Sequence, residues 1–73
     1  MPITVYTYDI TVAKLQHKEF LAGNAGGFVA GLFDLISHAN IGNRRKLALG
    51  FPEYVYVFMQ HVGELERISF IVK

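Results

Sequence analysis

The chain contains no cysteine, and its 73 residues carry a net charge of only +1. The missing cysteines exclude disulfides and thiolate metal sites, and they fit an intracellular protein. A near-neutral chain lacks the strongly positive surface that non-specific nucleic-acid binding requires. Its apolar runs fall short of the ~20 residues of a membrane span, and the N-terminus lacks the basic start of a signal peptide. We therefore expect a cytoplasmic protein that does not bind a membrane.

What the chain has in abundance is apolar residues, at 52% of the sequence against 18% charged residues. A domain this small buries only ~60% of the surface of its unfolded chain, and small domains often need oligomerisation as extra support. We expect residues 1–73 to form a single domain that a second copy or a protein partner stabilises.

The first predicted element is a strand over residues 3–12, which are rich in β-branched and aromatic side chains. Tyr6 and Tyr8 share one face of this strand with Ile10 and Val12, and that face is the better candidate for the core. In the alternative interpretation the two tyrosines are exposed and stack on RNA bases.

A helix is predicted after a polar connector at residues 13–19. Its apolar stripe recurs at helical spacing and comprises Phe28, Leu32, Leu35, Ile36 and Ala39. Asn24 is a plausible N-cap, and residues 40–42 supply the end of the helix. The glycines in this region favour close approach to a neighbouring backbone, since the phosphate-binding glycine patterns are missing.

Two further strands are predicted in the last third of the chain. The first covers residues 47–51 and ends at Pro52, and the second covers residues 67–73. The apolar segment between them, residues 53–62, is compatible with a helix that begins at Pro52 and ends at Gly63. Its partial alternation makes an irregular or partly extended segment the preferred interpretation, packed on the core or on a partner.

The element order is therefore β-α-β-β, which predicts an α+β fold with one helix packed on a three-stranded sheet. This is an incomplete, truncated ferredoxin-like domain that lacks its second helix and fourth strand. The first strand is then an open sheet edge. Such an edge invites a strand from another chain, including a second copy in a homodimer.

Several short motifs resemble a known family. They are Tyr8-Asp9-Ile10, Leu32-Phe33, Leu49-Gly50-Phe51-Pro52, Gly63 and the segment 66–70. Over nearly its whole length the chain resembles the N-terminal, ferredoxin-like half of the type I-F CRISPR repeat-processing endoribonuclease, a Cas-six-type protein.

The resemblance implies that the catalytic machinery is incomplete. The family's catalytic histidine corresponds to Ser37, with His38 one residue further on, and its RNA-gripping half is missing. Ser37 and His38 are thus the nearest catalytic candidates, and His38 is more simply a helix-end residue. His17 and His61 are isolated, so we expect no metal and no cofactor.

The function that follows is a non-catalytic mimic of the processing subunit, an anti-CRISPR inhibitor. Its partners would be type I-F effector subunits, with guide RNA as a further candidate. The expected contact residues are Tyr6, Tyr8, Arg44, Arg45, Lys46, Tyr54, Tyr56 and Phe58. Two alternatives stay open: half of a split endoribonuclease with His38 as general base, and a small homo-oligomeric RNA- or protein-binding module.

Overall fold

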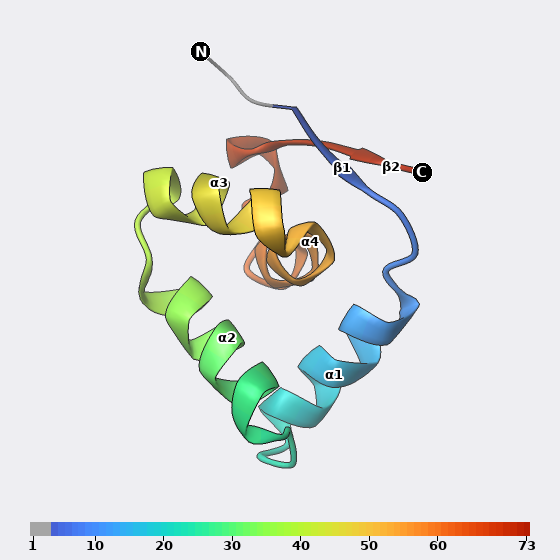
Figure 1. The fold of residues 1–73 in the computed structure, drawn as a ribbon, viewed down its shortest axis with the longest axis vertical. Coiled ribbons are helices and arrows are strands. Elements are labelled where there is room, and N and C mark those ends of the chain that lie inside the picture. The colour runs from blue at the N-terminus through green and yellow to red at the C-terminus, as the bar shows by residue number, and fades with distance from the viewer. Residues whose placement is uncertain (1–3) are drawn as a thin grey trace.

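Four helices and a two-stranded sheet make up the part of the chain that the computed structural model describes, residues 4–73. The elements are, in order, β1 (Thr4–Thr7), α1 (Thr11–Leu21), α2 (Gly27–His38), α3 (Ile41–Gly50), α4 (Pro52–His61), the 3₁₀ turn η1 (Leu65–Arg67) and β2 (Ser69–Val72). In Figure 1, α1 and α2 diverge from the turn that joins them, and α4 lies between them, seen nearly along its axis. The two-stranded sheet lies at the end of the molecule away from that turn. No helix within residues 4–73 is long and apolar enough to cross a membrane.

The predicted fold, one helix on a three-stranded ferredoxin-like sheet, is wrong. Residues 47–51, expected as the second strand, form the end of α3 and the turn into α4. Asn40 was expected only to end a helix, but its side-chain Oδ1 accepts a hydrogen bond from the backbone N–H of Asn43 at 2.8 Å. It is therefore the N-cap from which α3 begins, and this continues the chain as helix where a strand was expected.

Helix α1 occupies the segment that was expected to be a polar connector. Ala13 and His17 are buried and Phe20 packs against the core, a spacing that places all three on one face of a helix. Asp9 accepts a hydrogen bond from the backbone N–H of Thr11 at 2.9 Å, where α1 begins. Hydrogen bonds from Thr11 hold the pKa of Asp9 below its ordinary value.

Helix α4 occupies residues that were expected to be irregular or partly extended. Pro52 stands in its first turn, and Gly63 follows its end with a φ of +74°. Proline is favoured in the first turn of a helix and glycine just after its end. The alternative interpretation of residues 53–62 as a helix was therefore the right one. The buried side chains of α4 are Val55, Val57, Phe58 and Met59.

The sheet pairs the first strand with the last in parallel, from Thr4 opposite Ser69 to Thr7 opposite Val72. Val5 and Thr7 are buried, whereas Tyr6 and Tyr8 are exposed, so the expected orientation of β1 is reversed. The sheet packs on α4, and the face of β1 turned toward that helix carries the smaller β-branched side chains. The tyrosines lie on the side that no described element covers.

Arg44 ties the end of α2 to the rest of the fold. Its Nε donates to the carbonyl of Ile36 at 2.9 Å, and its Nη2 donates to the carbonyl of Ser37 at 3.2 Å. The guanidinium also lies 5.0 Å from the ring centroid of Phe58 and 3.6 Å from a carboxylate oxygen of Glu64. Arg44 thus donates to carbonyls at the C-terminal end of α2, where helix carbonyls lose part of their hydrogen bonding within the helix.

Replacing Arg44 therefore tests how the helices are held together. We expect Arg44→Met to lower the free energy of unfolding by about 2 kcal/mol, because two carbonyls lose a charged donor. Urea denaturation measures the change. The control is Arg45→Met, since Arg45 is exposed and, among residues 4–73, makes a single side-chain hydrogen bond, to the carbonyl of Arg67. Equal losses in the two variants would contradict the role given to Arg44.

Candidate protein-binding surface

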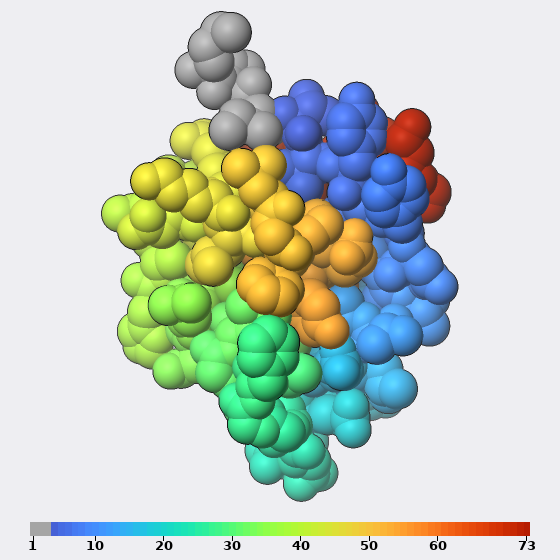
Figure 2. Space-filling model, viewed as in Figure 1, coloured from blue at the N-terminus to red at the C-terminus, as the bar shows by residue number. Residues whose placement is uncertain are grey.

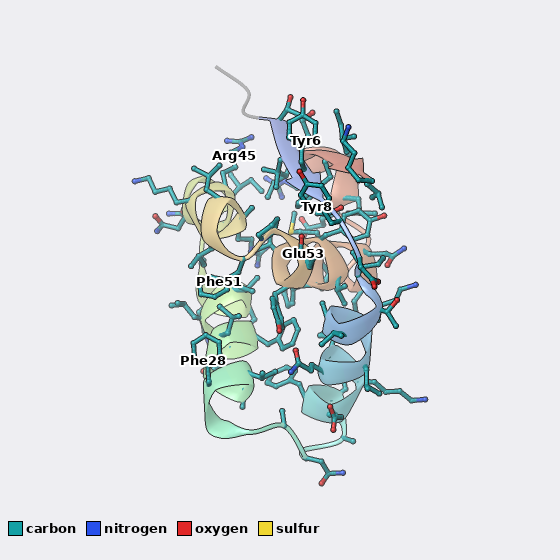
Figure 3. The ribbon with its side chains drawn as sticks, turned by 45° about the vertical axis from the view of Figure 1, so that its right-hand side comes forward. Tyr6, Tyr8, Phe28, Arg45, Phe51 and Glu53 are labelled. Carbon is teal, nitrogen blue, oxygen red and sulfur yellow. The ribbon has the colours of Figure 1, made fainter. Side chains whose placement is uncertain are left out.

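Aromatic side chains from three elements lie along one side of the molecule (Figure 3). The ring centroid of Phe28, on α2, is 5.8 Å from that of Phe51, which directly precedes α4. Two residues further on, Glu53 accepts a hydrogen bond from the backbone N–H of Tyr8 at 3.3 Å. Tyr6 and Tyr8 continue the row on β1 and the residue after it. We call these five residues the aromatic face.

One end of the aromatic face opens into a groove between α2 and α3. A hollow of about 400 Å³ is lined almost entirely by apolar residues and glycine: Gly27, Phe28, Gly31, Leu32, Leu35, Leu47 and Phe51. A second hollow of about 380 Å³ shares Leu35 and Leu47 with it and ends at His38, Ala39, Asn43 and Lys46. Because they share two lining residues, the two hollows are adjacent, and we call them together the α2–α3 groove. In Figure 2 the green surface of α2, the yellow surface of α3 and the orange start of α4 adjoin on one face.

Four of the predicted contact residues are exposed, and Arg44 is not among them. Tyr6, Tyr8, Arg45 and Lys46 are at the surface, where Tyr6 lies 5.2 Å from the ammonium group of Lys73. The guanidinium of Arg44 is engaged within the fold. The predicted basic cluster is therefore two exposed cations on a helix.

The remaining three predicted contact residues belong to α4, the central helix. Phe58 is buried, and Tyr54 and Tyr56 are half-buried. The hydroxyl of Tyr54 donates to Oε1 of Gln16, and the ring of Tyr56 lies 5.2 Å from that of Phe70. The apolar segment 53–62 was expected to pack either on the core or on a partner, and in the structure it packs in the core.

The sequence-based prediction missed the groove residues Phe28 and Leu35. Both belong to the apolar stripe that was expected to pack on the sheet, but they are 68% and 55% exposed. Only Leu32, Phe33 and Ile36 of α2 are buried. The available signal was Phe33, which lies outside the predicted stripe and is buried, so that the apolar surface of α2 is wider than the one face that was expected to pack.

The nearest catalytic candidates, Ser37 and His38, meet at the exposed end of α2. The hydroxyl of Ser37 lies 3.4 Å from Nδ1 of His38, and the same nitrogen lies 3.6 Å from a carboxylate oxygen of Asp34. A relay through an imidazole uses both ring nitrogens, one toward the nucleophile and one toward the carboxylate. Here both neighbours lie at one nitrogen, and both Ser37 and His38 contact the carbonyl of Asp34, at 2.7 and 2.8 Å. This arrangement caps a helix.

Comparisons with known protein families, with curated proteins and with solved structures find no match for this chain. The resemblance to the type I-F endoribonuclease therefore stays a prediction from sequence motifs. No group of three or more histidine or carboxylate side chains within residues 4–73 is placed to hold a metal ion.

A pair of histidines, of which His17 is buried and His61 is exposed, joins α1 to α4. His17 is 5% exposed, with its ring 4.8 Å from that of Phe33 and 4.9 Å from that of His61. Burial lowers the pKa of His17, and the neighbouring charge of His61 lowers it further. Protonation of His17 would thus place a charge among aromatic rings, which is unfavourable.

The stability of the fold should accordingly fall as the pH drops below about 6.5, the ordinary pKa of histidine. The pKa of His17 in the folded chain lies below the ordinary value of about 6.5, so the unfolded chain binds the proton more readily. Stability is therefore complete above about pH 6.5 and is lost as the pH falls toward the lowered pKa. Urea midpoints should fall over this range in the natural chain and fall less in His17→Phe. His38→Gln, at an exposed site, is the control; an unchanged pH dependence in His17→Phe would contradict the assignment.

Proposed function

We propose that this protein is a protein-binding module that recognises a partner through the α2–α3 groove and the adjoining aromatic face. The observation that carries the proposal is the exposure of Phe28 and Leu35 in an apolar depression, although the molecule has a well-buried core elsewhere. Exposed apolar side chains gathered into one patch mark interaction sites on soluble proteins. Aromatic residues are moreover enriched at the centre of such interfaces.

The charges near this surface favour a protein partner over RNA. Two cations, Arg45 and Lys46, are exposed on α3, and the carboxylate of Glu53 lies beside Tyr8 in the aromatic face. Binding to single-stranded RNA combines stacking aromatics with a positively charged groove along the backbone. The α2–α3 groove is instead lined mainly by apolar side chains.

The anti-CRISPR hypothesis is a narrower form of this proposal, in which the partner is a subunit of a type I-F CRISPR effector. Mimicry of a ferredoxin-like domain no longer supports it, because the chain does not have that fold. Phe51 and Pro52, expected at a strand corner, form the junction between α3 and α4. The choice of partner therefore depends on the sequence motifs alone, and the binding surface would be the groove.

Co-purification from cells that carry a type I-F system tests both forms of the proposal. We expect effector subunits to be retained by the natural chain and lost by the double variant Phe28→Ser, Leu35→Ser, which removes the exposed apolar side chains. Leu49→Ser is the matched control, because Leu49 is 60% exposed but does not line the groove. Retention of no effector subunit would contradict the CRISPR-specific form. Equal retention by the natural chain and the double variant would contradict the groove as the binding surface.

A further inference from the structure

The α2–α3 groove has the length of a short helix. It follows α2 from Phe28 to Ala39, which at 1.5 Å per residue is roughly 16 Å, or about three helical turns. Its walls are α2, with the exposed side chains Phe28 and Leu35, and α3, with the half-buried Leu47. A groove of this kind receives an amphipathic helix, whose apolar side chains recur at every third or fourth position.

Gly27 and Gly31 line this groove without a role in the chain's own packing. A Cβ atom added at either position would meet no other atom within 4 Å. Gly27 is the first residue of α2, but Gly31 lies inside the helix, where glycine lowers stability without an internal benefit. A groove wall without side chains does, however, allow the backbone of another helix to approach closely.

The charge of the groove is confined to one end. His38 and Lys46 line that end, and no carboxylate lines either hollow. The carboxylate of Asp34 lies 3.6 Å from His38 and offsets its charge when it is protonated, whereas Lys46 forms no ion pair within residues 4–73. Lys46 is therefore the free cation at the end of an apolar groove.

We propose that the α2–α3 groove binds an amphipathic helix of a partner protein, with acidic residues in its last turn placed beside Lys46. This inference rests on the proposed function and names the structural class of the partner. The orientation follows from charge, because carboxylates and the C-terminal end of a helix dipole are both attracted to a cation. The apolar stripe of the bound helix would cover Phe28, Leu35 and Leu47.

A second copy of this chain fits the groove less well than a different protein does. The last four residues of α2, α3 and α4 are Leu-Ile-Ser-His, Leu-Ala-Leu-Gly and Phe-Met-Gln-His, and none of them is acidic. The last turn of α1 contains Glu19 but also Lys18, so its charges offset each other. The charge at Lys46 therefore selects a helix that this chain does not itself supply.

The test is a titration of the ¹⁵N-labelled full chain with two synthetic 14-residue helical peptides, followed by NMR. Both peptides carry leucine at positions 3, 7 and 10, and they differ only in having two glutamates or two lysines in the last turn. We expect the acidic peptide to shift the resonances of Leu35, Lys46 and Leu47, and to bind at least tenfold more tightly than the basic one. In Lys46→Glu the preference should reverse.

A glycine variant separates a binding role from a folding role. Gly31→Ala should raise the melting temperature by several degrees, because alanine stabilises a helix interior, and should weaken binding of the acidic peptide at least tenfold. Gly50→Ala is the control: a Cβ at Gly50 also meets nothing within 4 Å, but this residue does not line the groove. Unchanged peptide binding by Gly31→Ala would overturn the assignment of the groove to a helix.

The remaining outcomes are equally decisive. Shifts confined to Tyr6 and Ile71 would place binding on the sheet, which would overturn both the helix assignment and the groove as the binding surface. A dimer in sedimentation whose groove resonances are protected would identify a second copy as the occupant and overturn the partner helix. Failure of both peptides to saturate the chain at 1 mM would also overturn it. If co-purification with the natural chain fails as well, the proposed function falls with it.

Discussion

Helix α4 is the constraint on which the rest of the structure depends. It contacts each of the other three helices as well as β1, and its residues Val55 and Met59 are fully buried. A helix that is apolar on nearly every side has no stable place at the surface, so other elements must cover it. Helices α1, α2 and α3 and the parallel sheet provide that cover, and the Arg44 guanidinium ties the end of α2 into the assembly.

The same constraint leaves an apolar surface free. Helix α2 turns Leu32, Phe33 and Ile36 inward, where they are buried in the core. Phe28 and Leu35 are also on α2, but they line the hollow beside α3 and stay exposed. The exposed groove is thus a geometric consequence of a helix with more apolar surface than its single central partner can cover. Exposed apolar patches of this kind mark interaction sites, which is why we propose a partner protein there.

The sequence predicted the existence of the first and last strands and of α2, but the fold class could not be obtained from it by local patterns. In α4 the run Tyr54 to Phe58 alternates bulky β-favouring side chains, and strand propensity outweighed the helix boundaries at Pro52 and Gly63. Whether such a segment forms a helix or a strand depends on its burial by elements far away in the sequence, and a short stretch of sequence does not show that burial.

The other errors have equally specific causes. In α1 the inward face contains His17, which does not count as apolar when a periodic pattern is sought, although it packs among aromatic rings. In α3, Leu47, Leu49 and Phe51 alternate with smaller residues, a pattern that is typical of a strand. Asn40 caps the start of α3, but in the sequence the same residue is also compatible with the end of a helix. For the candidate surface, Tyr6, Tyr8, Arg45 and Lys46 are exposed and their contact role stays a prediction, whereas the groove depends on how two helices meet. How α2 and α3 meet can be seen only in the three-dimensional structure.

The central claim is that Phe28 and Leu35 form an open apolar surface while Phe33 and Met59 form the core beside α4. Paramagnetic relaxation by a small, soluble gadolinium chelate measures the exposure of each side chain directly in the free protein. The account predicts strong relaxation of the Phe28 ring and the Leu35 methyl groups, and weak relaxation of Phe33 and Met59. Equal protection of all four side chains would show that the groove is already covered in the isolated protein, and would contradict the account.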